Sequence, residues 1–176
     1  MLQSDEWSGD RTWEADQHII VEAPEGYLKW TVVRNPFGRA VSLWLYSQPG
    51  LPERGGFGKP VFDTFREYLR WVLLKQVTGD GQAISVNNSF FYWPITQWFK
   101  SVKPDLVLKL EELPRCLLSI PCFQGKALFL PFSNYTACDQ WRQYYGPEEE
   151  ALVRECFKSD FEEYGYDDQI RSIGKI

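Results

Sequence analysis

The sequence predicts an α/β domain in which a small, largely parallel sheet is flanked by helices. Two short apolar stretches, residues 29–34 and 106–110, have the composition of buried strands. Stretches with helical periodicity lie between and after them, and strands joined through helices usually pair in parallel. The 176 residues are 44% hydrophobic and 16% aromatic, which is enough for one domain with a substantial core.

The first strand leads directly into a helix. The segment "TVVRNPFGRAVSLW" places Arg34 at the strand end and Asn35 at the position of a helix cap. Pro36 is typical of a first helical position, because its missing N–H has no partner there in any case. We expect this helix to continue to about Ser47.

The middle of the chain alternates between irregular and helical stretches. The glycine and proline content of residues 47–60 predicts a loop. Apolar residues spaced by three and four predict an amphipathic helix over residues 61–77. Residues 86–102 are aromatic and are interrupted by Pro94, so we expect an irregular, partly buried segment.

The last helix is predicted by its ends as well as by its periodicity. Pro147 opens it, and three glutamates follow in the first turn, where the helix dipole favours negative charge. One apolar face continues through Phe157 to Phe161, and Gly165 is the natural stop. We therefore expect a single helix that ends at Gly165.

Charge and composition exclude several classes of function. The net charge of −5 and the pI near 5.0 argue against a nonspecific binder of nucleic acid or of anionic membranes. No apolar run approaches the ~20 residues of a membrane-spanning helix, and the N-terminus lacks the pattern of a secretory signal. We therefore expect a cytoplasmic protein. The four cysteines and the single histidine, His18, lack metal-site spacing, so we expect no metal.

Polar residues on the first helix indicate a site for an anion. A helical turn of about 100° per residue places Asn35, Arg39, Ser42 and Tyr46 on one stripe. Arg34 lies beside the helix N-terminus, where N–H groups and the dipole favour an anion. The pattern predicts a phosphate or sulfate site. The alternative is that both arginines pair with carboxylates and that Ser42 is simply solvated.

The segment "VVRNPFGRAVSLW" resembles the loop by which sulfotransferases bind the 3′-phosphate of the sulfate donor PAPS. Arg34 and Ser42 match the two defining positions, and Arg39 matches a frequent basic position between them. "LVLKLEEL" and "WRQYYGPEEEALVRECFKSDFEEYGY" resemble later segments of the carbohydrate-sulfotransferase-like branch. The resemblance divides the chain into a polar N-terminal segment (1–26), a sulfotransferase-like domain (27–166) and a C-terminal tail (167–176).

The resemblance implies a P-loop-like α/β fold that transfers a sulfuryl group from PAPS, without a metal, to a hydroxyl acceptor. The acceptor would be a carbohydrate or a small molecule. Arg34, Arg39 and Ser42 would bind the donor's 3′-phosphate. His18 lies about where related proteins place a histidine, so it is the candidate general base. Glu111 and Glu112 are weaker candidates, and Tyr92, Trp93, Trp98 and Phe99 are candidate walls of an acceptor or adenine pocket, or simply core.

One family segment has no match before Arg34, namely the loop with lysine, glycine and Ser/Thr that wraps the donor's 5′-phosphosulfate. The nearest sequence, "GGFGKP", carries Pro60 at the Ser/Thr position and is expected to be a surface loop. Two alternatives follow. The N-terminus of the protein has been lost from this chain, or the chain is a degenerate, non-catalytic member that serves as a nucleotide-binding or protein-interaction domain.

Overall fold

The computed structural model describes residues 26–47, 62–78, 93–99, 103–127 and 138–170. It is an α/β structure with a two-stranded parallel sheet and several helices, which confirms the expected fold class at this level. The described elements are, in chain order, β1 (Trp30–Val33), α1 (Pro36–Ser47), α2 (Phe65–Thr78), α4 (Ile95–Trp98), β2 (Leu106–Lys109), the 3-10 helices η1 (Leu110–Glu112), η2 (Arg115–Ser119), η3 (Pro121–Phe123) and η4 (Cys138–Tyr144), α5 (Pro147–Cys156) and α6 (Lys158–Tyr164).

Strands β1 and β2 pair in parallel, as the sequence predicts. The register runs from Trp30 opposite Leu106 to Val33 opposite Lys109. Each strand ends one residue earlier than expected, so Arg34 and Leu110 lie just beyond the two strand ends. Because the strands are parallel, these two exits lie at the same end of the sheet, where the carboxyl ends of strands commonly form ligand sites.

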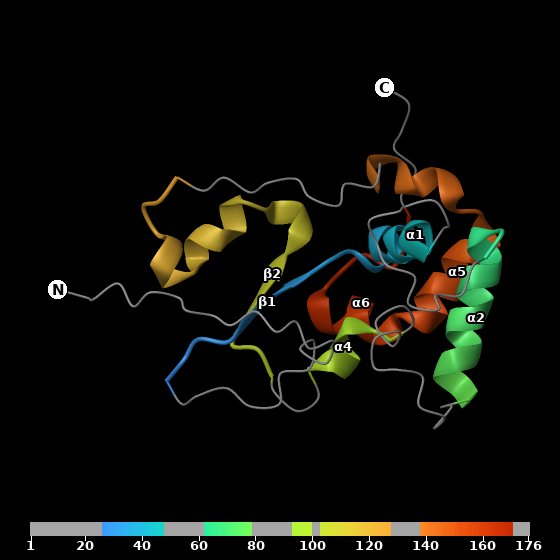
Figure 1. Cartoon of the computed structure of the whole chain (residues 1–176), viewed down its shortest axis with the longest axis horizontal. Helices are drawn as coiled ribbons and strands as arrows, with labels where there is room; N and C mark the ends of the chain where they lie inside the picture. The colour runs from blue at the N-terminus through green and yellow to red at the C-terminus, as the bar shows by residue number, and fades with distance from the viewer. Residues whose placement is uncertain (1–25, 48–61, 79–92, 100–102, 128–137, 171–176) are drawn as a thin grey trace.

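There are two hydrophobic clusters, and the elements that build them lie on different sides of the two strands (Figure 1). The larger one is built by α1, α2, α5 and α6 and is rich in aromatic rings. At its centre the ring of Phe37 stacks on Trp141, with centroids 5.9 Å apart, and meets Phe161 at 5.0 Å. The smaller cluster joins β2 to η2 and η3. None of the helices among the described residues is long and apolar enough to cross a bilayer.

Helix α1 spans the predicted residues, and its cap is the predicted one. The Asn35 side-chain oxygen accepts a hydrogen bond from the Phe37 N–H at 2.9 Å. Phe37, Ala40 and Val41 are buried in the larger cluster, and Pro36 is buried as well. The strand, turn and helix at Arg34 were therefore predictable from local sequence.

Helix α2 begins at Phe65, four residues later than predicted. Thr64 and Glu67 form a reciprocal capping box at this point. The Glu67 N–H donates to the Thr64 hydroxyl oxygen at 3.2 Å, and the Thr64 N–H donates to the Glu67 carboxylate at 3.1 Å. Hydrophobic spacing alone includes Phe62 in the helix, whereas the capping groups exclude it.

The last helix is not continuous, which contradicts the single helix expected over this region. Phe157 has φ −121° and ψ 26°, so α5 ends at Cys156 and α6 begins at Lys158. Gly165 is the stop, as predicted, with the left-handed φ of +61°. The apolar pattern continues across the break because Val153, Phe157 and Phe161 all face the larger cluster, so periodicity could not reveal it. A second correction concerns residues 86–102, where the described part contains the short helix α4.

The carboxyl group of Glu149 makes the stability of the α2–α5 contact dependent on pH. Burial raises the pKa of this carboxyl, but hydrogen bonds from Arg66 and from backbone N–H groups outweigh that effect, so the pKa lies below its usual value. A lowered folded-state pKa stabilises the protein above the unfolded-state pKa, near 4.3, and the stabilisation is lost as the pH falls. We expect Glu149→Gln to unfold at lower urea concentration than wild type at pH 7.

The same comparison at pH 3 should show a much smaller gap between the two proteins. Glu155→Gln, a change at an exposed position of the same helix, is the matched control and should leave the urea midpoint nearly unchanged. A gap that stays constant between pH 7 and pH 3 would contradict this electrostatic account.

Candidate active site

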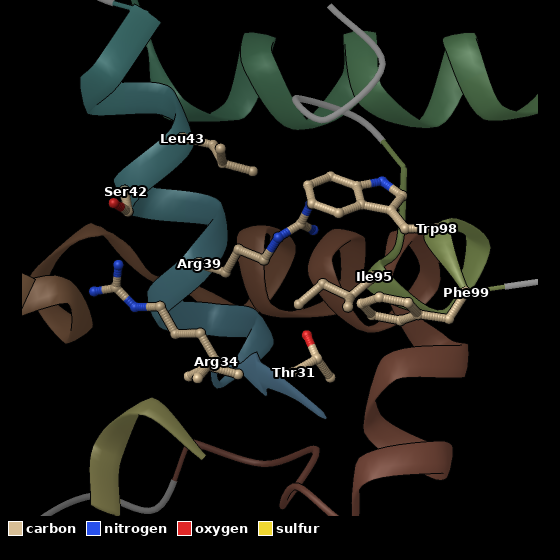
Figure 2. Close-up of a pocket in the computed structure, with 9 residues that line it drawn as sticks. Thr31, Arg34, Arg39, Ser42, Leu43, Ile95, Trp98 and Phe99 are labelled. Atoms are coloured by element: carbon tan, nitrogen blue, oxygen red, sulfur yellow. The ribbon is translucent and has the colours of Figure 1, made fainter. Parts of the chain in front are cut away.

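A cavity of about 270 Å³ lies where β1, α1 and α4 meet. Its volume is near the lower end of the ~300–1,000 Å³ that small-molecule sites usually occupy. The three predicted anion-binding residues, Arg34, Arg39 and Ser42, all line it (Figure 2). The remaining lining residues are Thr31, Val32, Leu43, Ile95, Trp98 and Phe99.

The two guanidinium groups point in different directions. Figure 2 shows the Arg34 guanidinium and the Ser42 hydroxyl on one side of α1, and the Arg39 guanidinium on the other side, beside Trp98. Among the described residues, Arg34 forms no ion pair and the Ser42 hydroxyl forms no hydrogen bond. The structure therefore brings the three residues to the lining of one cavity, but their polar groups lie on two sides of α1.

Arg39 is buried, although the helical stripe placed it with Ser42 on the face expected to bind an anion. Its residue exposure is 7%, and its Nη2 donates to the Trp93 carbonyl at 2.9 Å. The guanidinium also lies over the rings of Trp98 and Phe157, at 5.5 and 5.3 Å from their centroids. Burial lowers the pKa of Arg39, and the negative charge of Asp160 opposes that shift. Arg39 thus connects α1 to α4 and to Trp93 just before that helix.

Asp160, which sequence reasoning did not single out, also holds α4 in place. It is only 1% exposed, and its two carboxylate oxygens accept the N–H groups of Ile95 and Thr96 at 2.8 and 2.9 Å. These are the first N–H groups of α4, which the helix itself cannot pair. A sequence signal was present, since Asp160 follows Phe157 by three residues on an otherwise apolar helical face.

The N-terminus of α1 already has protein acceptors. The Asn35 side chain accepts the Phe37 N–H, and the Asn35 N–H donates to the Glu111 carboxylate at 2.7 Å. An anion at this end of α1 would therefore depend on the side chains of Arg34 and Ser42 more than on free backbone donors. The helix dipole would still favour it.

The side chain of Arg34 lies along the first turn of α1, over Gly38. A methyl group built at Gly38 would be 3.5 Å from Arg34 Nε and 3.7 Å from the ring of Trp141. These are ordinary contact distances, so alanine would fit at Gly38. A longer side chain would compete with Arg34 for the same space.

The other predicted site residues divide into described and undescribed ones. His18, Tyr92 and the segment "GGFGKP" lie outside the described residues, so the assignment of His18 as general base stays a prediction. Glu111 and Glu112 follow β2 on η1, and both carboxylate oxygens of Glu111 are engaged in hydrogen bonds. Within the described part of the chain, no group of three or more His, Cys, Asp or Glu side chains is placed to hold a metal ion.

The arrangement suits an anion attached to a flat, partly apolar group. An arginine fork and a hydroxyl can bind a tetrahedral oxyanion through several charge-assisted hydrogen bonds. Ile95, Trp98 and Phe99 form a mainly apolar wall of the cavity, on the same side of α1 as the Arg39 guanidinium. Such a wall is suited to the face of a ring.

Comparisons of the chain with models of protein families, with curated proteins and with solved structures found no match.

Asp160→Ala should be strongly destabilising. The change removes two hydrogen bonds to α4 and leaves the buried charge of Arg39 without its opposing carboxylate. We expect a loss of about 3–5 kcal/mol in the free energy of unfolding, the range for removing one partner of a buried charge pair. Urea unfolding followed by tryptophan fluorescence measures it.

Glu162→Ala, at an exposed position two residues away on α6, is the matched control. We expect it to change stability by less than about 0.5 kcal/mol, as is usual for exposed positions. Equal effects of the two substitutions would rule out a special role for the Asp160 carboxylate.

Proposed function

We propose that this chain is a sulfotransferase-like domain that binds the 3′-phosphate end of PAPS and serves sulfuryl transfer to a hydroxyl acceptor. The observation that carries the proposal is the placement of Arg34 and Ser42 beside the same cavity. Arg34 leaves the end of β1, Ser42 lies two turns along α1, and their polar groups lie on the same side of α1 without a partner among the described residues. The resemblance of the segment that contains them points to the same ligand.

Charge and geometry support a phosphate monoester as the anchored group. The guanidinium of Arg34 can donate two parallel hydrogen bonds, and the Ser42 hydroxyl can donate a third. Arg39 adds a second positive charge to the cavity wall, although its guanidinium is engaged with Trp93 and its neighbours. Direct contact of Arg39 with the phosphate stays a prediction of the resemblance.

The wall formed by Ile95, Trp98 and Phe99 is suited to a planar group, such as the base of a nucleoside that carries the phosphate. In the proposed complex the nucleoside extends along this wall, so the 3′-phosphate fixes the position of the whole donor. Anchoring acts at a distance from the reacting sulfur and assists transfer by positioning. The wall itself depends on Arg39 and Asp160, which hold α4.

The chemistry is an in-line displacement at sulfur, comparable to phosphoryl transfer, and PAPS would supply the sulfuryl group. The acceptor hydroxyl, a sugar or a small molecule, needs a general base because its pKa is high. His18 is the candidate for that base. In the non-catalytic alternative, the chain binds the nucleotide but does not transfer the sulfuryl group.

The binding half of the proposal predicts that Arg34→Ala weakens the affinity for adenosine 3′,5′-bisphosphate by about 1.5–3 kcal/mol, the range for hydrogen bonds to charged groups. Calorimetric titration measures it. The matched control is Arg115→Ala, which removes an exposed arginine that does not line the cavity. Adenosine 5′-monophosphate should bind wild type and Arg34→Ala equally weakly, because it lacks the 3′-phosphate. Unchanged affinity of Arg34→Ala for the bisphosphate would remove the site assignment.

The catalytic half is tested by incubating the 176-residue chain with radiolabelled PAPS and a panel of glycan and small hydroxyl acceptors. These residues contain no lysine, glycine and Ser/Thr loop before Arg34, so we expect at best weak bisphosphate binding and no detectable label transfer. Removing one preorganised oxyanion donor already costs about 10²–10³ in rate. Transfer that is lost in His18→Ala would instead support catalysis by this chain, with His18 as its base.

A further inference from the structure

One side chain connects the candidate site to a part of the chain that is distant in sequence. The Glu111 carboxylate accepts the Asn35 N–H at 2.7 Å through one oxygen and the Tyr166 hydroxyl at 2.9 Å through the other. Asn35 directly follows Arg34, and Tyr166 directly follows the glycine that ends α6. Glu111 therefore bridges the β1–α1 turn and the turn after α6.

We propose that Glu111 is a positioning residue, which holds the β1–α1 turn against Tyr166 and so sets the position from which Arg34 reaches the cavity. The inference rests on the proposed function for its ligand. It concerns a residue that does not line the cavity and acts through the backbone of Asn35.

The turn after α6 is itself held in place, so it can serve as a support. Lys109 donates to the Gly165 carbonyl at 3.2 Å, and its amine lies 4.5 Å from the centroid of the Tyr166 ring. Gly165 adopts φ +61°, which turns the chain so that Tyr166 returns toward β2. Burial and the neighbouring Glu111 charge raise the pKa of Tyr166, so its hydroxyl remains a proton donor across the physiological range.

Positioning by Glu111 and repulsion by its charge have opposite effects on an anion bound at Arg34. A carboxylate near the site disfavours a phosphate electrostatically, so removing only the charge should strengthen binding or leave it unchanged. Removing the hydrogen bonds should weaken binding, because the turn that carries Arg34 is released. The variants Glu111→Gln and Glu111→Ala separate these effects, since glutamine keeps an acceptor for the Asn35 N–H and alanine does not.

The experiment measures adenosine 3′,5′-bisphosphate affinity for wild type, Glu111→Ala, Glu111→Gln and Tyr166→Phe by calorimetry. Glu112→Ala is the matched control, because it removes the same charge from the exposed neighbour on η1. We expect Glu111→Ala to bind about threefold to tenfold more weakly, an indirect effect comparable in size to one typical hydrogen bond. Tyr166→Phe should show a smaller loss, and Glu111→Gln and Glu112→Ala should bind as well as wild type or better.

Amide hydrogen exchange at Asn35 supplies a readout that needs no ligand. Glu111→Ala should increase the exchange rate of this amide about tenfold or more, while Glu111→Gln should largely preserve its protection. If wild type does not bind the bisphosphate, the proposed function fails, and the exchange rates still decide whether Glu111 holds the turn.

Two results would overturn the inference. One is unchanged exchange at Asn35 in Glu111→Ala. The other is stronger bisphosphate binding in Glu111→Ala than in wild type, matching Glu112→Ala, because Glu111 would then act through its charge alone.

Discussion

A charge can be buried in a protein only where opposite charge or hydrogen bonds replace the lost water, and Asp160 meets this condition beside Arg39. Its carboxylate accepts two N–H groups of α4, while Arg39 holds the Trp93 carbonyl just before that helix. A four-residue helix has little stability of its own. The position of α4, and with it the aromatic wall of the cavity, therefore depends on this pair of buried charges.

The break between α5 and α6 serves the same arrangement. A straight helix would continue the direction of α5, whereas the turn at Phe157 gives α6 its own direction, and Asp160 on α6 reaches the N–H groups of α4. Phe157 also lies against the guanidinium of Arg39, at 5.3 Å from the ring centroid to the guanidinium carbon. The C-terminal region thus supports the site from two directions, through α6 and through Tyr166 on Glu111.

Local sequence predicted the elements whose signals are local. Asn35 and Pro36 mark the start of α1, and Gly165 marks the end of α6, because capping and left-handed turns depend on single residue types. The late start of α2 shows the limit of periodicity, since the capping box of Thr64 and Glu67 decided that boundary. Residue spacing also predicted that Arg34, Arg39 and Ser42 belong to one site, and all three line the cavity. It did not predict the direction of the Arg39 side chain.

The sequence by itself determined the two strands, the helix that follows Arg34 and the chemistry available beside it, because these depend on residues within one or two turns of each other. The tertiary structure decided that Arg39 is buried, that Asp160 supports α4 and that Glu111 joins Asn35 to Tyr166. The partners in these contacts lie 54 to 76 residues apart. No local pattern encodes such pairings, since they arise only when parallel strand ends and packed helices bring distant segments together.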